Sequence, residues 1–206
     1  MESISPKVIA CPRAPWSPAV ATLVRAFAAA PVALHLFPVA AQRPAGMAHI
    51  FRRALRYGHQ YGRVDMIPSA GAVAIWIEPQ YVWPSWSGWI QTGIMLLPLA
   101  LGWRATCRMW RFERFIEVCQ FQTIAGPHWY LFCSGVSPEQ QGQGVGAALI
   151  RHGLQRAQAT HTSCYLETAN ARNLPFYQQN GFRTVGQKHQ PAAGPCVCSL
   201  VAGADR

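Results

Sequence analysis

Three glycines close together in residues 136–154, VSPEQQGQGVGAALIRHGL, form the pattern in this chain that most clearly suggests chemistry. Gly142, Gly144 and Gly146 lie within five residues and lead into an apolar-periodic stretch that indicates a helix. A helix N-terminus exposes unpaired N–H groups and a partial positive charge, and glycine lets a ligand approach them because it lacks a Cβ. The segment therefore predicts a site for a phosphate-containing ligand.

Two known phosphate-binding patterns fit this turn incompletely. A nucleotide-hydrolysing P-loop requires a lysine directly after its last glycine, whereas two alanines follow Gly146. The dinucleotide-binding pattern GxGxxA is satisfied from Gly142 to Ala147, and the acidic Glu167 follows about twenty residues later. However, residues 137–141 separate the predicted strand from the first glycine, and only about forty residues remain after Glu167 for the rest of a parallel sheet. An NAD-dependent oxidoreductase is therefore the weaker alternative.

Two motifs, in the expected order, resemble the GNAT acetyltransferase superfamily. Gln141-x-x-Gly144-x-Gly146 matches that superfamily's Q/RxxGxG/A motif, and it follows a predicted strand and the residues VSPE. Downstream, LETANARNLPFYQQNGF is similar to the second motif, in which a short helix presents a tyrosine just before GF. The resemblance is closest to the puromycin N-acetyltransferase-like branch in these residues and in the upstream AVAIWIEP, and it is specific over about 128–183.

This resemblance implies a GNAT fold, an α/β (α+β) single domain whose mixed, mostly antiparallel central sheet is flanked by helices. It also implies acetyl-CoA as the acetyl donor. The amides of the glycine turn would bind the coenzyme A pyrophosphate, and the strand before it would pair with the pantetheine arm, where that strand splays from the next one. Gly135 fits a local distortion at that point. The implied cofactor-binding residues are Ser134, Gly135, Val136, Gln141, Gly142, Gln143, Gly144, Val145, Gly146, Ala147, Asn170 and Asn173.

For catalysis, the resemblance implies that Tyr177 protonates the departing thiolate. Direct attack on a thioester also requires a neutral amine, and an unperturbed ammonium of pKa ~10.4 is neutral only about one part in a thousand near pH 7. A carboxylate is expected to help. Glu167 ends a predicted strand beside the acetyl gap and is our first choice as base or acceptor anchor, and Glu78 is the second. The remaining acids are expected at the surface: Glu139 in a solvent-facing loop, and Glu113 and Glu117 paired with arginines along one helix.

The middle of the chain is rich in tryptophan and is expected to contact the acceptor. Trp76, Trp83, Trp86 and Trp89 would line a pocket for a flat or apolar amine, and packing in the core is an equally good explanation of them. We assign Trp76, Glu78 and Trp83 to substrate binding. His128, at the start of a strand, is expected to pack or to bond locally. Cys133 and Cys164 have no base partner nearby in sequence, so we expect neither a covalent enzyme intermediate nor a metal.

Alternating helices and strands must position these residues. The pattern predicts helices near 17–29, 45–57, 104–120 and 174–180, and a helix that runs from the glycine turn to about residue 159. It predicts strands near 63–67, 72–77, 128–136, 163–167, 182–186 and 196–201. Alternation of this kind indicates an α/β or α+β domain. We expect a single domain over 1–206, with the cofactor-binding core at about 128–183 and the acceptor-side elements at about 16–122.

Composition restricts the choice of partners. Half of the 206 residues are hydrophobic and 13% are charged, as in a globular protein, and the formal charge of +10 suits an anionic partner such as a phosphate-rich cofactor. Arg52, Arg53 and Arg56 lie opposite the apolar stripe of their predicted helix, so a solvated face is expected rather than a nucleic-acid or membrane surface. The seven cysteines form no CxxC pair, which favours reduced thiols in a cytoplasmic protein, and the apolar run 93–103 is too short to span a bilayer.

Together these features predict acetyl-CoA-dependent transfer of an acetyl group directly to a primary amine of a small molecule, by a monomer or homodimer. Two further alternatives stay open. One is acetylation of a protein or peptide N-terminus, which needs an open groove. The other is a non-catalytic module that senses acyl-CoA.

Overall fold

A seven-stranded sheet forms the centre of the protein in the computed structural model, which describes residues 7–83 and 96–203. The strand order is β1-β2-β3-β4-β5-β7-β6, and every neighbouring pair is antiparallel except β4 and β5. The mixed, mostly antiparallel sheet confirms the predicted fold class. The strands are β1 (Ile9–Ala10), β2 (Gly62–Ile67), β3 (Ala72–Ile77), β4 (His128–Val136), β5 (Ser163–Thr168), β6 (Arg183–His189) and β7 (Cys196–Ala202).

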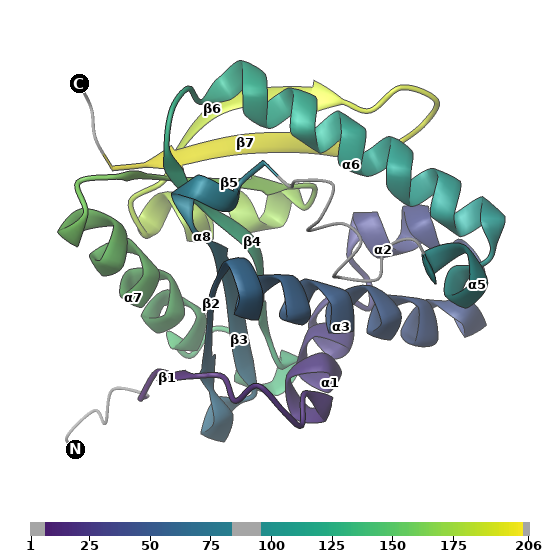
Figure 1. The fold of residues 1–206 in the computed structure, drawn as a ribbon, viewed down its shortest axis with the longest axis horizontal. Coiled ribbons are helices and arrows are strands. Elements are labelled where there is room, and N and C mark those ends of the chain that lie inside the picture. The colour runs from purple at the N-terminus through teal and green to yellow at the C-terminus, as the bar shows by residue number, and fades with distance from the viewer. Residues whose placement is uncertain (1–6, 84–95, 204–206) are drawn as a thin grey trace.

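The parallel pair β4 and β5 is joined along only part of its length. His128–Tyr130 pairs with Ser163–Tyr165, but β4 continues to Val136 and β5 to Thr168 without further pairing. The two strands therefore diverge toward their C-terminal ends, and the sheet opens there. Figure 1 shows the consequence, because β5, β6 and β7 lie across the top of the molecule while β2, β3 and β4 run downward from them.

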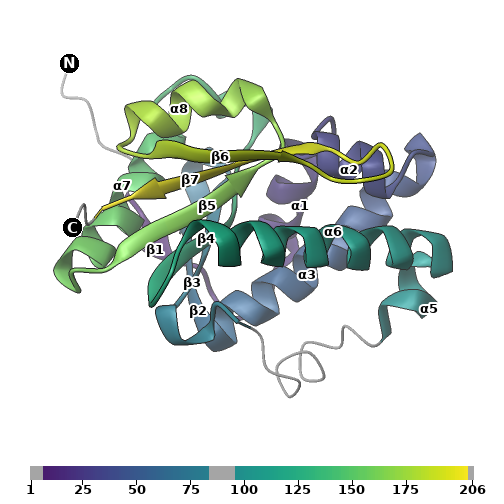
Figure 2. The same cartoon turned by 90° about the horizontal axis from the view of Figure 1, so that it is seen from above.

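Helices cover both faces of the sheet (Figure 2). α7 packs against β2, β3, β4 and β5, whereas α1 and α3 pack against the other face. α6 lies against β6, β7 and α2 and crosses the side of the molecule where β5 leaves β4. The helices are α1 (Ser17–Ala26), α2 (Pro31–Leu36), α3 (Arg43–Tyr61), α5 (Leu97–Leu101), α6 (Trp103–Thr123), α7 (Val145–Ala159) and α8 (Leu174–Gln179).

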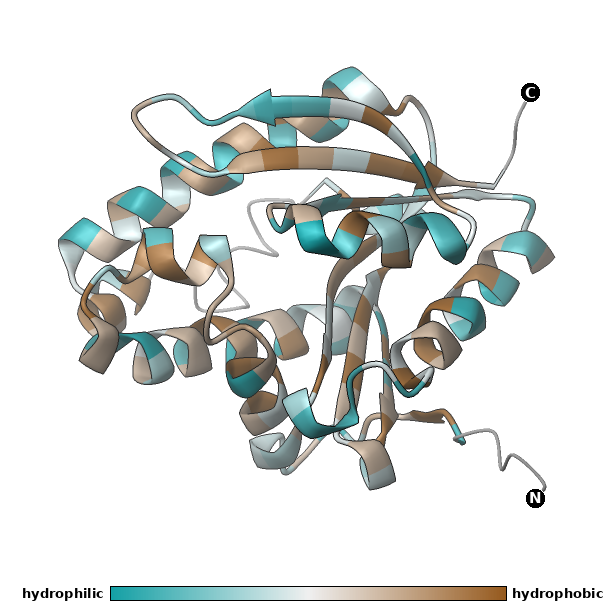
Figure 3. Cartoon of the chain, turned by 180° about the vertical axis from the view of Figure 1, so that it is seen from behind, coloured by the Kyte–Doolittle hydropathy of each residue, from teal (hydrophilic) through white to brown (hydrophobic). Residues whose placement is uncertain are grey.

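The hydrophobic core lies on both sides of the central strands. β3 is buried along its whole length, so its two faces serve two clusters: Val73, Ile75 and Ile77 pack under α1 and α3, and Ala72, Ala74 and Trp76 pack under α7. Figure 3 shows this pattern as hydrophobic residues on the central strands and hydrophilic residues on the outer turns of the helices. A strand that is buried on both faces has a continuous apolar sequence rather than alternating apolar and polar residues.

The predicted elements are all present, with shifted ends. α3 begins two residues and ends four residues beyond the predicted 45–57, and α6 extends the predicted 104–120 to Trp103–Thr123. The first helix ends at Ala26, and a separate helix, α2, starts at Pro31, because proline suits a first helical turn. β1, α2 and α5 are too short to show a periodic pattern and were not predicted.

All seven cysteines are free thiols. In the described parts of the chain, no helix is long and apolar enough to cross a membrane. On α3, Arg52 and Arg56 are exposed and Arg53 is half-buried, while Phe51, Ala54 and Leu55 are buried, so the predicted face is solvated at Arg52 and Arg56 and partly covered at Arg53.

Candidate active site

A β-bulge marks β4 where it is no longer paired with β5. The register with β3 pairs Ile75 with Cys133 and then Trp76 with Leu131, so Phe132 is the extra residue. The predicted distortion is therefore real but lies at Phe132 and not at Gly135. Gly135 lacks a side chain for another reason, because a Cβ there would lie 3.0 Å from Leu23 Cδ2 of α1. α1 packs directly on this part of β4.

The glycine turn lies between the end of β4 and α7, as predicted. Gly142 and Gly144 both have φ of +77°, a left-handed conformation that glycine adopts without strain, and a Cβ at either position would meet open space. Gly144 is the N-cap of α7, so no side chain caps the helix. The first amides of α7, Val145 to Ala147, consequently point out of the helix without an intrahelical acceptor.

Two glutamines hold the loop in shape from within. Gln141 Nε2 donates to the carbonyl of Val136 at 3.0 Å, and Gln143 Nε2 donates to the carbonyl of Glu139 at 2.9 Å. Glu139 is exposed, as predicted, and forms an ion pair with Arg25 of α1. The side chains of the loop are thus directed back to the protein, and its backbone remains available to a ligand.

Close packing brings α8 against the first turn of α7. A Cβ at Gly146 would lie 3.2 Å from Phe176 Cζ of α8 and 3.5 Å from Val136 Cγ2 of β4. The predicted residues Asn170 and Asn173 shape the loop that leads into α8: Asn170 Oδ1 accepts from the Arg172 amide at 3.2 Å, and Asn170 Nδ2 donates to Asn173 Oδ1 at 3.4 Å. The end of β4, the first turn of α7 and α8 therefore meet where β4 is no longer paired with β5.

Tyr177 lies on α8 beside this opening and is 8% exposed. Its ring packs edge-on against Phe176 and Phe182. Burial, and to a lesser extent the Cys133 thiol of β4, raises the pKa of its hydroxyl, so Tyr177 keeps its proton at neutral pH. A buried, protonated phenol next to the bulge of β4 is suited to donate a proton.

Glu167 is the second residue of β5 beyond the part that pairs with β4. Its Oε1 is buried and has no hydrogen-bond partner. Burial raises the pKa of this carboxyl to about 8, although hydrogen bonds from the Tyr165 and Tyr130 hydroxyls favour the ionised form and counteract part of the shift. The charge of Glu113 raises the pKa further. Glu167 thus titrates near the pH at which it would act as a base.

Glu113 was expected to pair with arginines at the surface, but among the described residues it forms no ion pair. Glu113 is half-buried on the side of α6 that also carries Met109, Ile116 and Gln120, at i−4, i+3 and i+7. Burial, followed by the charge of Glu117, raises the pKa of its carboxyl to about 7. Its spacing from the apolar Met109 and Ile116 could have revealed the position, since it places Glu113 beside the buried stripe. Glu117 behaves as predicted and pairs with Arg114 at 3.0 Å.

The structure does not bring the predicted acceptor residues together. Trp76 is 0% exposed and lies beneath α7 in the core, so it presents no surface to an acceptor, and its assignment to substrate binding is wrong. Trp83 is 45% exposed and contacts Phe121 of α6 edge-on at 6.1 Å. Trp86 and Trp89 lie outside the described residues.

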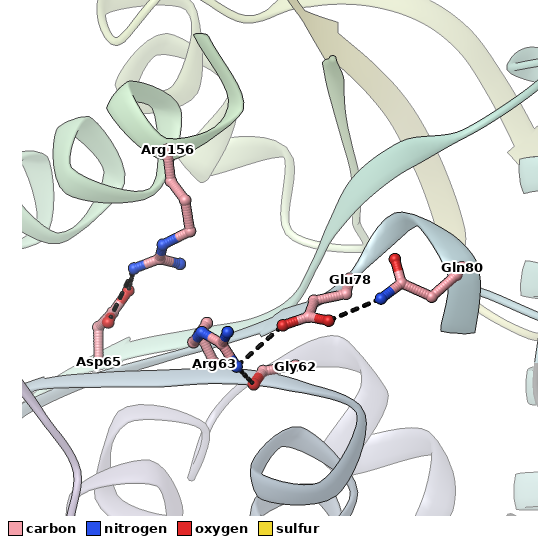
Figure 4. Close-up of polar contacts among 6 residues, drawn as sticks. All are labelled: Gly62, Arg63, Asp65, Glu78, Gln80 and Arg156. Atoms are coloured by element: carbon pink, nitrogen blue, oxygen red, sulfur yellow. Dashed lines mark hydrogen bonds and ion pairs between the residues drawn. The ribbon is translucent and has the colours of Figure 1, made fainter. Parts of the chain in front are cut away.

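Glu78 lies apart from Glu167, at the end of β3 where β4 begins. It pairs with Arg63 at 2.9 Å and accepts from Gln80 at 2.8 Å (Figure 4). Figure 4 also shows Asp65 of β2 bound to Arg156 of α7, at 2.8 and 3.0 Å. Both carboxylates are already neutralised by arginines, and the second contact fastens α7 to the sheet.

His128 bonds locally, as predicted. Its Nδ1 lies 2.9 Å from the carbonyl of Gly126 and its Nε2 lies 2.8 Å from Gln120 Nε2. A neutral ring that donates from Nδ1 and accepts at Nε2 satisfies both contacts, and burial lowers the pKa of this imidazole. Across residues 7–83 and 96–203, no group of three or more His, Cys, Asp or Glu side chains is placed to hold a metal ion.

Comparison with known proteins gives a consistent result. The model of the acetyltransferase (GNAT) family matches residues 73–182. A crystal structure described as histone acetyltransferase HPA2 and related acetyltransferase, from Corynebacterium glutamicum, is 25% identical, with a TM-score of 0.69 over 98% of both chains. Arylalkylamine N-acetyltransferase 2 from Aedes aegypti shares the fold at 9% identity, with a TM-score of 0.57 over 96% of this chain and 98% of that one.

Proposed function

Because this chain belongs to the GNAT acetyltransferase family and is an acyltransferase, we propose that it transfers the acetyl group of acetyl-CoA directly to a primary amine of a small molecule. The observation that carries the proposal is the opening between β4 and β5. It has the uncapped N-terminus of α7 at one end and the buried carboxyl of Glu167 on its wall. The diphosphate of a bound acetyl-CoA requires the first of these features, and an incoming amine requires the second.

The glycine turn fits the diphosphate of acetyl-CoA. Open space lies where Gly142 and Gly144 would carry a Cβ, and the adjacent amides of α7 offer N–H donors at the positive end of the helix dipole. The free edge of β4, from the bulge at Phe132 to Val136, can pair with the extended amides of the pantetheine arm. We assign donor binding to this edge, to residues 141–147 and to the loop of Asn170 and Asn173.

Two side chains would handle protons. Acetyl-CoA supplies an activated acyl group, and the amine must reach it neutral. Glu167, with its pKa raised to about 8, accepts the proton of the ammonium. Tyr177, which stays protonated, donates to the sulfur that leaves. Both groups line the same opening, one from β5 and the other from α8.

Enclosure of the acceptor side favours a small molecule over a protein. Phe112 and Ile116 of α6 pack with Val197 of β7, and Val32 of α2 and Ala169, after β5, pack against them. These contacts place α6 and α2 over Val197 and Ala169, and we take them as one wall of an enclosed acceptor side. Acetylation of a protein amine remains the second candidate, because the description of the Corynebacterium glutamicum structure names a histone acetyltransferase. A closer kinship with puromycin N-acetyltransferases also stays a prediction.

Thermal-shift measurements with acetyl-CoA, coenzyme A and NAD, followed by an amine panel read out as released thiol, test the proposal. Stabilisation by both coenzyme A species but not by NAD, with turnover of small amines, is the expected result. Absence of a shift with either coenzyme A species would remove the donor site. Binding without turnover of any amine or peptide would instead favour a module that senses acyl-CoA.

A further inference from the structure

The outward side of α6 and the adjacent α5 expose large apolar side chains. On α6, Trp103, Trp110 and Phe121 are 72%, 50% and 75% exposed. Leu96, directly before α5, and Leu99, within it, are 57% and 86% exposed. We call these five side chains the apolar face of α5 and α6. Apolar side chains gathered in this way on a protein surface mark an interaction site.

The spacing along α6 places its three exposed rings in one line. Trp110 and Phe121 follow Trp103 by seven and eighteen residues, which correspond to about two and five turns of an α-helix. The line is about 27 Å long at a rise of 1.5 Å per residue. The opposite side of the helix packs on β7 at Phe112, and Figure 1 shows α6 at the outside of the molecule. The apolar face is therefore a long ridge directed to solvent.

Positive charge accompanies this ridge along one flank. Arg104 and Arg111 each follow a tryptophan of the ridge by one residue, which turns them about 100° to its side. Within residues 7–83 and 96–203, neither of these two arginines forms an ion pair. Arg114 is also exposed but shares its charge with Glu117. A helix that carries tryptophan on one side and arginine beside it is typical of proteins that bind an anionic membrane surface.

A cavity opens on the arginine flank, between α6 and the hairpin that joins β6 to β7. Its volume is about 400 Å³, within the range of small-ligand sites. Two guanidinium groups and two aromatic rings line it without any acid: the lining residues are Trp110, Arg111, Arg114, Phe115, Gln190 and Pro191. Guanidinium groups bind phosphate oxygens through paired hydrogen bonds. The cavity thus has the charge to receive a phosphate headgroup, directly beside the ridge.

A second copy of the chain suits this surface less well than an anionic lipid surface does. The formal charge of +10 makes two copies repel each other, and the arginine flank adds to that repulsion where two α6 helices meet. Tryptophan rings favour the boundary between headgroups and acyl chains, because they are apolar with one polar N–H. A membrane surface therefore matches the ridge, its charged flank and the cavity together.

We propose that the apolar face of α5 and α6 docks on a membrane surface rich in anionic phospholipid. Trp103 and Trp110 enter the headgroup region. Arg104 and Arg111 pair with lipid phosphates, and the cavity between α6 and the hairpin holds one headgroup. The helix lies in the plane of the interface, so this mode of binding requires no membrane-spanning segment. It goes beyond the proposed acetyl transfer, since none of these residues is assigned to the donor or the acceptor.

Vesicle co-sedimentation of the full chain tests the proposal. Vesicles of phosphatidylglycerol and phosphatidylcholine in equal parts would be compared with vesicles of phosphatidylcholine alone, at low and at physiological ionic strength. Binding to the anionic vesicles should be about tenfold tighter or more, and salt should weaken it, because the arginine contacts are exposed to screening. Equal binding to both kinds of vesicle, or binding to neither, would overturn the proposal.

Four variants locate the surface. Leu99→Ser combined with Trp103→Ser should weaken binding to the anionic vesicles about tenfold or more. Arg111→Gln should weaken it about fivefold. Ile9→Ser on β1 and Arg151→Gln on α7 are the matched controls, because they change exposed residues elsewhere, and their effect should stay below about twofold. All four proteins should keep the thermal shift with acetyl-CoA, which shows that they are folded and separates lipid binding from donor binding.

Two outcomes of the variant series would contradict the assignment. Vesicle binding that survives both the double serine variant and Arg111→Gln would remove the apolar face as the docking surface. Size-exclusion chromatography distinguishes the other occupant. A parent protein that dimerises without binding vesicles, together with a double serine variant that stays monomeric, would assign the face to a second copy of the chain.

Discussion

The indole of Trp76 fills the space that a side chain at position 153 would occupy. A Cβ on Gly153 would overlap Cζ2 and Cε2 of the ring and lie 2.8 Å from Cη2. The contact joins the C-terminal part of β3 to the middle of α7, whose first turn forms the proposed diphosphate site. Trp76 therefore supports α7 as part of the hydrophobic core.

Gly153→Ala tests this contact. We expect a loss of about 1–3 kcal/mol in the free energy of unfolding, because the added methyl group must displace either the indole or α7. Urea denaturation measures it. Adding Trp76→Phe, which removes part of the ring, should make the alanine less costly than it is in the parent. A Gly153→Ala protein of unchanged stability but with a raised KM for the amine would instead support the earlier prediction that Trp76 contacts the acceptor.

Gly144→Ala should weaken acetyl-CoA binding beyond its effect on stability. At φ of +77° an alanine costs roughly 1–2 kcal/mol, and its Cβ would enter the open space in front of the α7 amides. Gly126→Ala is the matched control, since Gly126 has φ of +76° and equally open surroundings at the other end of β4. Both variants should lose similar stability in denaturation. Only Gly144→Ala should raise the KM for acetyl-CoA, by about tenfold; a similar KM in both would contradict the site.

The sequence predicted those parts of this protein that local rules determine. The glycine turn, the strand before it and the helix after it follow from glycine conformation and apolar periodicity, and the structure has them at 128–136 and 145–159. Trp76 and Glu113 were misplaced for a different reason. Which face of β3 meets α7, and which flank of α6 meets β5, depends on packing between elements far apart in the chain. The position of Glu113 was also hard to predict because it lies in an arginine-rich helix, and a run of charged residues is typical of a solvent-exposed face.

Tyr177→Phe should reduce kcat by about 100-fold or more while leaving the KM for acetyl-CoA nearly unchanged. Loss of a general acid typically costs this much, and the ring contacts with Phe176 and Phe182 remain in the phenylalanine variant. The steady-state rate of thiol release gives both constants. Phe182→Leu, which alters the same packing but keeps the hydroxyl, serves as the control. Equal losses in the two variants would assign Tyr177 a packing role only.

The rate of acetyl transfer should rise with pH through the titration of Glu167. A carboxyl must be ionised to accept a proton, and the pKa of Glu167 is raised to about 8. The contribution of this group to kcat/KM should therefore increase up to about pH 8 and then level off. A bound cationic amine favours the ionised carboxylate, so the inflection in kcat should fall at a lower pH than that in kcat/KM. Glu167→Gln should remove the inflection. A profile flat between pH 6 and pH 9 would exclude Glu167 as the base.

Stability should show the opposite dependence on pH. Glu113 and Glu167 have pKa values raised from 4.5 to about 7 and about 8, so between pH 4.5 and pH 8 the folded state retains protons that the unfolded chain has released. The free energy of unfolding must therefore fall as pH rises across this range, and level off above it. Glu113→Gln removes its share, on the order of 1–3 kcal/mol after allowance for solvent screening, so the variant should gain stability relative to the parent at pH 8 but not at pH 5. Urea denaturation at the two pH values measures the difference.

Glu117→Gln, which removes a surface ion pair with Arg114, is the control and should shift the free energy of unfolding at both pH values by less than about 1 kcal/mol. A parent protein whose stability rises from pH 5 to pH 8, with Glu113→Gln following the same curve, would show that the two carboxyls are solvated.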